Sequence, residues 1–199
     1  MTKTDILGDL EEASQVLDSF IAAGGAAEIE TAGEIMAESL RNGGKIISCG
    51  NGGSNCDAMH FAEELSGRYR NDRRALGAVA CDNPGHLTCV GNDYGFKYVF
   101  SRFVEGIGRP GDVLLGISTS GNSGNIIEAV ESAKKAGLKT VVLTGNDGGQ
   151  LAGLADAEVR VPFHGHSDRI QEVHIKIIHI LIRYIEDYLS LSSSEQNCQ

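Results

Sequence analysis

The chain has 199 residues, 27 of them acidic and 17 basic, and a formal net charge of −10. This charge argues against a nucleic-acid partner, because displacing the counterions of a polyanion needs a basic face. With 41% hydrophobic and 22% charged residues the chain is not intrinsically disordered, and its length suits one domain with its own core. Its five cysteines form no Cys-x-x-Cys motif, which favours a reducing, cytoplasmic compartment.

Neither end of the chain carries a targeting or membrane signal. The first nine residues include Lys3, Asp5 and Asp9 and lack the apolar centre of a signal peptide. The longest apolar stretch, residues 175–185, is interrupted by charged and polar side chains, so we expect no membrane-spanning segment.

The order of elements along the chain predicts an α/β fold with a mainly parallel sheet. Residues 4–23 and 27–42 have helical apolar spacing, and short apolar runs then alternate with helix-length segments. We expect strands at 45–49, 75–81, 113–117, 140–143 and 159–161, and further helices at 54–69, 96–107, 123–136 and 168–189. The chain thus divides into an N-terminal helical extension (1–44), a sheet domain (45–189) and a polar tail (190–199).

The dipeptide Gly-Asn occurs four times, and three of these follow a predicted strand directly. Ligands of open α/β sheets bind outside the carboxyl ends of the strands. Gly-Asn is also a common turn dipeptide, and we prefer that interpretation at 145–146. At the other positions the neighbouring residues favour ligand loops.

One such loop, between the strand at 113–117 and the next helix, is rich in hydroxyl groups. It contains Ser118, Thr119, Ser120 and Ser123. A helix N-terminus after a loop of this kind binds phosphate through free N–H groups and the helix dipole. The loop has no lysine, so it is not a P-loop, and hydroxyl and amide groups should hold the phosphate. The alternative is an ordinary turn with a serine N-cap.

A second loop, residues 49–54, precedes the helix that carries His60 and Glu64. Ser54 and Asp57 resemble a capping box that starts this helix. His60 and Glu64 are four residues apart and share a helix face, where they can bind a metal or act as base and partner. The alternative is a solvated surface pair.

The last predicted helix places Gln171 and His179 eight residues apart, about 12 Å along an ideal helix. His179 lies among isoleucines and is either a core histidine or a neutral imidazole directed into a site. The two residues can reach one ligand only if the helix start is irregular or if one belongs to a neighbouring subunit.

The only basic cluster follows the helix of His60. We expect Arg70, Arg73 and Arg74 to form a solvated face, whereas Arg68, one turn after Glu64, could face the site.

Taken together, these segments resemble the phosphoheptose isomerases, also called sedoheptulose 7-phosphate isomerases. The matching motifs follow in order up to about Leu189: CGNGGSNCDAMHFAEEL, GRYR, VGNDYGF, LLGISTSGNS, LTGNDGG and DRIQEVHIKIIHILI. The resemblance implies the sugar-isomerase (SIS) fold, a five-stranded parallel sheet flanked by helices, with an N-terminal extension that builds a homotetramer. It implies conversion of sedoheptulose 7-phosphate to D-glycero-D-manno-heptose 7-phosphate in the cytoplasm, the first step toward ADP-heptose for lipopolysaccharide.

The resemblance also assigns roles to individual residues. It implies one zinc ion per subunit, with Glu64 and His179 as the acid/base pair. The implied zinc ligands are His60, Glu64, Gln171 and His179. The implied substrate contacts are Asn51, Gly52, Gly53, Glu64, Asn92, Asp93, Ser118, Thr119, Ser120, Ser123 and Gln171.

Two other protein classes share this fold. One is a non-catalytic tetrameric scaffold that binds the bacterial replication initiator and lacks the carboxylate and imidazole corresponding to Glu64 and His179. This chain has both, which favours the enzyme. The other class, sugar-phosphate-sensing regulators, carries an added DNA-binding domain for which this chain has neither the length nor the charge.

Overall fold

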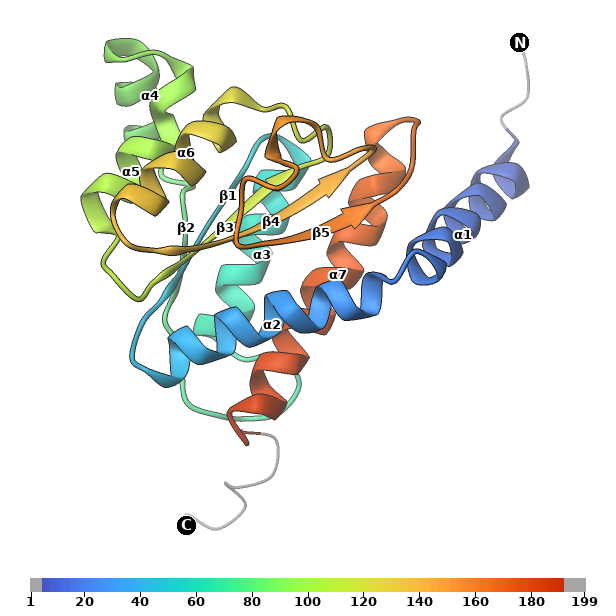
Figure 1. Ribbon diagram of the computed structural model, residues 1–199, viewed down its shortest axis with the longest axis horizontal. Coiled ribbons are helices and arrows are strands. Elements are labelled where there is room, and N and C mark those ends of the chain that lie inside the picture. Colours follow the sequence, from blue (N-terminus) through green and yellow to red (C-terminus); the bar gives the residue numbers. More distant parts are fainter. Residues whose placement is uncertain (1–4, 192–199) are drawn as a thin grey trace.

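The computed structural model describes residues 5–191, which form a parallel sheet between two layers of helices (Figure 1). The strand order is β2-β1-β3-β4-β5, and every neighbouring pair is parallel. The strands are β1 (Ile46–Gly50), β2 (Ala78–Ala80), β3 (Val113–Ser118), β4 (Lys139–Gly145) and β5 (Ala157–Val161). The predicted fold class is therefore confirmed.

Helices cover both faces of the sheet. The helices are α1 (Ile6–Ala22), α2 (Gly25–Arg41), α3 (Gly53–Ser66), α4 (Pro84–Asp93), α5 (Val99–Ile107), α6 (Gly124–Lys135) and α7 (Ser167–Tyr188), with short 3-10 turns at η1 (Phe96–Tyr98) and η2 (Gly149–Leu151). One hydrophobic core joins α1, α2, α3 and α7 to the sheet, and the other joins α4, α5 and α6 to its opposite face. Because both faces are covered, β3 is buried along its whole length, which explains its continuous apolar sequence.

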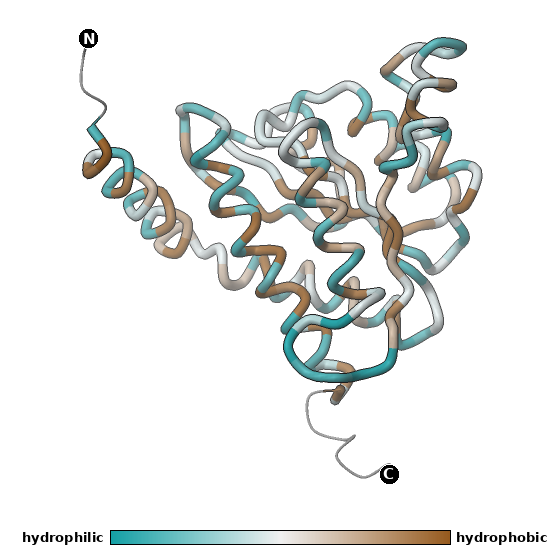
Figure 2. Tube along the Cα trace, turned by 180° about the vertical axis from the view of Figure 1, so that it is seen from behind, coloured by the Kyte–Doolittle hydropathy of each residue, from teal (hydrophilic) through white to brown (hydrophobic). Residues whose placement is uncertain are grey.

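The two N-terminal helices differ in how they pack. Helix α2 contributes Met36 and Ala37, both fully buried, to the core beside α7. Helix α1 buries only Val16 and Phe20 and extends away from the sheet (Figure 1). Hydrophobic and hydrophilic segments alternate along its free end in Figure 2, and Ile6, in its first turn, is exposed. The role of this extension in oligomerisation remains a prediction.

Helix α4 was not predicted. It begins after Asn83, whose side chain accepts a hydrogen bond from the His86 N–H, and Pro84 occupies its first turn. Both residues are typical helix-start signals. The expected strand at 75–81 is also shorter, because β2 covers only Ala78–Ala80.

Within residues 5–191, no helix combines the length and the apolar character needed to cross a membrane. Most of the predicted polar tail, residues 192–199, lies outside the described residues.

Candidate active site

Three predicted site residues meet on the α-helical layer formed by α3 and α7. His60 and Glu64 project from α3, and His179 from α7. One possible ligand atom from each lies within 4.8 Å of the others. The two histidine Nε2 atoms are 3.0 Å apart, and His60 Nε2 is 3.5 Å from a Glu64 carboxylate oxygen. His179 is half-buried and directed toward α3, so it is not a core histidine.

The donor set of this cluster fits zinc. Two imidazoles and a carboxylate are ligands typical of zinc sites, and ligand atoms about 2.0–2.1 Å from a tetrahedral ion lie about 3.3 Å from one another. The two measured separations, 3.0 and 3.5 Å, are close to that spacing. The cluster is partly accessible, since the side chains of His60 and Glu64 are 36% and 16% exposed.

Two neighbours orient the histidines. His60 Nδ1 lies 3.5 Å from the carboxylate of Glu63, an arrangement that leaves Nε2 facing the cluster. The ring of Tyr69 packs against His179 with centroids 5.7 Å apart. Glu63 lies about 100° around the helix from Glu64. The ring of His60 nevertheless approaches both carboxylates, with Nδ1 3.5 Å from Glu63 and Nε2 3.5 Å from Glu64.

The loop between β1 and α3 is tied to the start of α6. The side-chain amides of Asn51 and Asn125 exchange two hydrogen bonds, of 2.9 and 2.8 Å. Asn125 is buried, and no motif in the sequence pointed to it. Gly52, with φ of 55°, has a backbone conformation that favours glycine. This loop therefore joins the carboxyl ends of the adjacent strands β1 and β3.

Gln171 lies at this loop rather than at the histidines. A Cβ atom at Gly53 would be 2.7 Å from Gln171 Oε1, so glycine leaves the room that this side chain occupies. Gln171 and His179 are separated by two turns of a regular helix. Within one chain, the geometry supports Gln171 as a substrate contact, and its role as a fourth metal ligand remains a prediction.

The hydroxyl-rich loop between β3 and α6 has the arrangement expected of a phosphate site. Ser118 Oγ donates to Ser123 Oγ at 2.9 Å, and Ser120 Oγ accepts from the Asn122 N–H at 3.2 Å. Ser123 is the N-cap of α6, but its side chain makes no capping bond. The first N–H groups of α6 therefore lack a side-chain cap, as at a helix N-terminus that can bind an anion.

A lysine from a different segment adds positive charge near this loop. Lys97, in η1, lines a cleft of about 320 Å³ together with Asn51, Ser123 and Asn125. Lys97 Nζ is 2.7 Å from a Glu128 carboxylate oxygen, and this hydrogen bond raises the pKa of Lys97. As expected, the hydroxyl-rich loop itself contains no cationic side chain, but Lys97 lines the same cleft as Ser123.

Asn92 and Asp93 are not part of the His60, Glu64 and His179 cluster. They end α4, on the helical layer opposite to α3 and α7, and are exposed. In the described part of the chain their side chains hydrogen-bond to each other and to Cys89. Their assignment as substrate contacts remains a prediction.

Two expectations about this region were wrong. Ser54 does not cap α3: the helix begins at Gly53, with Gly52 as N-cap and no side-chain capping bond, because the glycine loop sets the helix start. Arg73 is not solvated: it is buried and paired with Glu186. Arg68, which follows the end of α3, is exposed.

Asp57, on α3 between Gly53 and His60, is a further titratable group near the site. Burial raises the pKa of its carboxyl group to about 6, an effect opposed by the nearby His60. Among the described residues its Oδ2 atom has no hydrogen-bond partner.

Known proteins resemble this chain in sequence and in fold. Residues 10–145 match the SIS domain family. The phosphoheptose isomerase of Tolumonas auensis is 63% identical, over 92% of this chain and 96% of that protein, and that of Vibrio vulnificus is 60% identical, over 91% and 95%. The phosphoheptose isomerase structure from Neisseria gonorrhoeae superposes with a TM-score of 0.86 at 42% identity, covering 92% of this chain and 97% of that one. The one from Francisella tularensis gives 0.85 at 36%, covering 93% and 100%. The chain therefore belongs to the phosphoheptose isomerase family of SIS-domain proteins.

Proposed function

We propose that this chain is an aldose–ketose isomerase that converts sedoheptulose 7-phosphate to D-glycero-D-manno-heptose 7-phosphate. The observation that carries the proposal is the cluster of His60, Glu64 and His179. Two of these residues lie on α3, the helix that begins at the predicted substrate loop. Gly53 and His60 are seven residues apart on α3, about 10 Å along the helix. An open-chain sugar phosphate is long enough to span this distance between the predicted substrate loop and the cluster.

Different residues of the site would carry out different parts of the reaction. Moving a carbonyl from C2 to C1 requires removal of a proton from C1 and its return to C2 through an enediolate. Glu64, a carboxylate with limited solvent exposure, would take and return this proton. His179 would exchange protons between the two sugar oxygens, held in position by the ring of Tyr69. The phosphate loop, remote from the reacting carbons, would supply orientation.

We further propose that His60, Glu64 and His179 hold zinc, with Gln171 as the fourth ligand. The chemistry that bound zinc supplies is polarisation of the substrate carbonyl. The donor spacing described above supports the first three ligands. Gln171 needs another side-chain conformation or a neighbouring subunit to reach the same ion.

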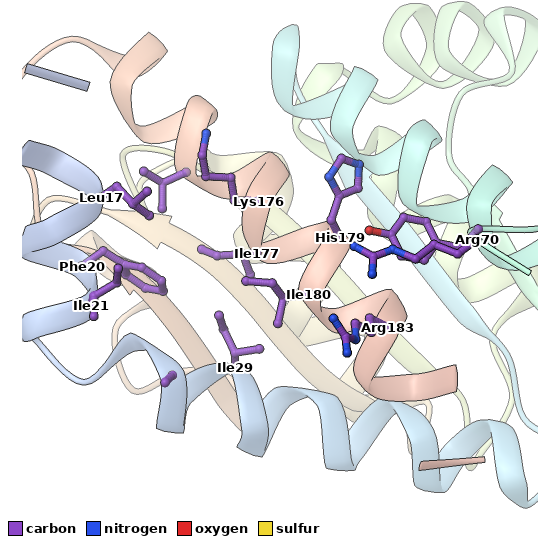
Figure 3. A pocket seen from close by; sticks show the side chains of 13 residues that line it. Leu17, Phe20, Ile21, Ile29, Arg70, Lys176, Ile177, His179, Ile180 and Arg183 are labelled. Atoms are coloured by element: carbon purple, nitrogen blue, oxygen red, sulfur yellow. The ribbon is translucent and has the colours of Figure 1, made fainter. Parts of the chain in front are cut away.

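We propose that a second copy of this chain packs on the groove between α1, α2 and α7, within a homotetramer. The groove, of about 520 Å³, is mostly apolar and reaches His179. In Figure 3 side chains of α1 and α7 face each other across it, and His179 lies on the side of α7 toward Arg70. Leu10 and Ile180 are 65% and 49% exposed, and such apolar side chains on the same helices suit a self-complementary contact.

Sedimentation velocity tests this assembly. Leu10→Asp should dissociate the tetramer and lower activity, whereas Gln15→Asp, which adds the same charge to an exposed position of α1, should not. A wild-type chain that sediments as a monomer with full activity would contradict the proposal. We also expect the enzyme to act in the cytoplasm and to supply ADP-heptose synthesis.

The direct test of the reaction uses purified full-length chain and sedoheptulose 7-phosphate, with product followed by NMR. We expect conversion that a chelator abolishes and zinc restores. Absence of conversion by the zinc-loaded chain would contradict the proposed reaction. Conversion that is insensitive to exhaustive chelation would contradict only the metal requirement.

A further inference from the structure

The side chain of Arg73 is buried at the carboxyl end of α3. Only 2% of it is exposed. Its Nε donates to Glu186 Oε1 at 2.6 Å. Its Nη1 and Nη2 atoms donate to four main-chain carbonyls around the end of that helix, belonging to Glu64, Leu65, Gly67 and Arg74. A single guanidinium thus binds the last turn of α3, the loop that follows it and a carboxylate of α7.

Stability alone is a weak explanation for this arrangement. Removing Arg73 and Glu186 from water has a cost that largely offsets their attraction, and apolar side chains of similar volume often stabilise a core equally well. A guanidinium fixes the directions of its hydrogen bonds, because its donors form a rigid planar fork. Its positive charge also suits the carboxyl end of a helix.

The ion pair connects the two helices that carry the candidate metal site: Glu186 is on α7, and Arg73, in the loop after α3, binds the end of α3. Arg73 Nη2 donates at 2.7 Å to the main-chain carbonyl of Glu64, itself a member of the cluster. Glu186 is seven residues after His179 on α7, about two turns farther on the same helix face. The Arg73–Glu186 bond therefore joins α3 to α7 just beyond the place where His60 meets His179.

The spacing of the cluster depends on how these helices are held. His60 and Glu64 move with α3, and His179 moves with α7, so the 3.0 Å distance between the histidine nitrogens reports the separation of the helices. Metal sites tolerate only about 0.5 Å of displacement in their ligands. At the amino ends of the helices, the absence of a Cβ at Gly53 leaves room for the side chain of Gln171, so α3 and α7 also approach closely there.

We propose that Arg73 and Glu186 are a positioning pair that fixes the separation of α3 and α7 and thereby holds His60, Glu64 and His179 at metal-binding distance. This inference rests on the proposed metal site. It assigns neither Arg73 nor Glu186 a contact with substrate.

The test compares Arg73→Lys and Glu186→Gln with two controls. Lysine can pair with Glu186 but cannot reach all four carbonyls, and glutamine accepts the Nε hydrogen bond without the charge. Arg74→Lys is the matched control, because Arg74 is adjacent and exposed. Val130→Ala, in the core on the other face of the sheet, is the stability control.

Zinc affinity is measured by competition with a chromophoric chelator, at a temperature where circular dichroism shows each variant to be folded. We expect Arg73→Lys and Glu186→Gln to bind zinc at least tenfold more weakly and to have a lower kcat, with KM nearly unchanged because the phosphate loop is distant from the pair. Arg74→Lys and Val130→Ala should keep wild-type zinc affinity, the latter despite a lower thermal midpoint. If Arg73→Lys does not fold, the zinc affinity and kcat of Glu186→Gln alone test the proposal.

Zinc affinity and kcat within twofold of wild type in both variants would overturn the positioning role, as would an equal loss in Val130→Ala. If the wild type isomerises the sugar without binding zinc, the proposed metal site is wrong. The kcat values of the two variants relative to wild type then decide whether Arg73 and Glu186 position the three residues. A wild-type chain that neither binds zinc nor isomerises the sugar contradicts both proposals.

Discussion

Asn51 and Asn125 exchange two amide hydrogen bonds and so join the loop after β1 to the first turn of α6. This pair connects the predicted substrate loop to the predicted phosphate loop. Because Asn125 is buried, few other side chains can satisfy Asn51 at this position.

Asn125→Asp should weaken substrate binding with little change in fold. The carboxylate can accept from the Asn51 amide but cannot donate to it, and its negative charge opposes a phosphate at the same helix N-terminus. We expect KM for the sugar phosphate to rise at least tenfold. Asn71→Asp, an exposed change in the loop after α3, is the charge-matched control and should leave KM unchanged. Equal KM values for the two variants would exclude this role for Asn125.

Ser123→Ala should raise KM and leave kcat nearly unchanged. The Ser123 hydroxyl would hold phosphate equally in the ground and transition states, which is uniform binding. Ser132→Ala, in the same helix but hydrogen-bonded to Glu105, provides the control. Steady-state kinetics at saturating substrate separates the two parameters. A large fall in kcat with an unaltered KM would show that the loop does not serve as a phosphate anchor.

His174 should make the fold sensitive to acid. It is fully buried, its Nε2 contacts the Thr144 carbonyl at 2.9 Å, and burial lowers its pKa from 6.5 to about 4. The folded state therefore favours the neutral imidazole. This contribution to stability is complete above pH 6.5 and is lost as pH falls toward 4. Each pKa unit corresponds to about 1.4 kcal/mol, so the full loss is about 3 kcal/mol.

Chemical denaturation between pH 7 and pH 4 measures this effect. Glutamine can donate to the same carbonyl without titrating, so His174→Gln should lose less stability than wild type over this range. Parallel pH profiles for the two proteins would show that His174 does not contribute.

The sequence was informative where local pattern and tertiary structure agree. Strands β3 and β4 are buried on both faces, so their continuous apolar runs predict strands from the local sequence alone. Gly-Asn at 50–51 and the serine-rich loop were predicted to lie at one edge of the sheet, and both follow the carboxyl ends of the adjacent parallel strands β1 and β3. The pairing of His60 with Glu64 followed from helical spacing.

The failures at Arg73 and Asn125 arise from contacts between residues far apart in sequence. Arg73 looked like a surface arginine because its polar loop gives no sign of Glu186, which lies 113 positions later. Asn125 was missed because only the fold brings it to Asn51. Helix α4 was missed because Gly85 and Gly91 weaken its local helical pattern, although Asn83 and Pro84 mark its start.

The central claim is that Glu64 is the base of the isomerisation, and Glu64→Gln tests it most directly. The amide is nearly isosteric, so the helix should keep its packing, but it cannot accept a proton and is a poorer metal ligand. The measurement is the rate of sedoheptulose 7-phosphate conversion by zinc-loaded Glu64→Gln enzyme, with the thermal midpoint recorded on the same sample. We predict a fall in kcat of at least about 10²-fold with the thermal midpoint preserved. A folded Glu64→Gln enzyme that converts the sugar at the wild-type rate would contradict the claim.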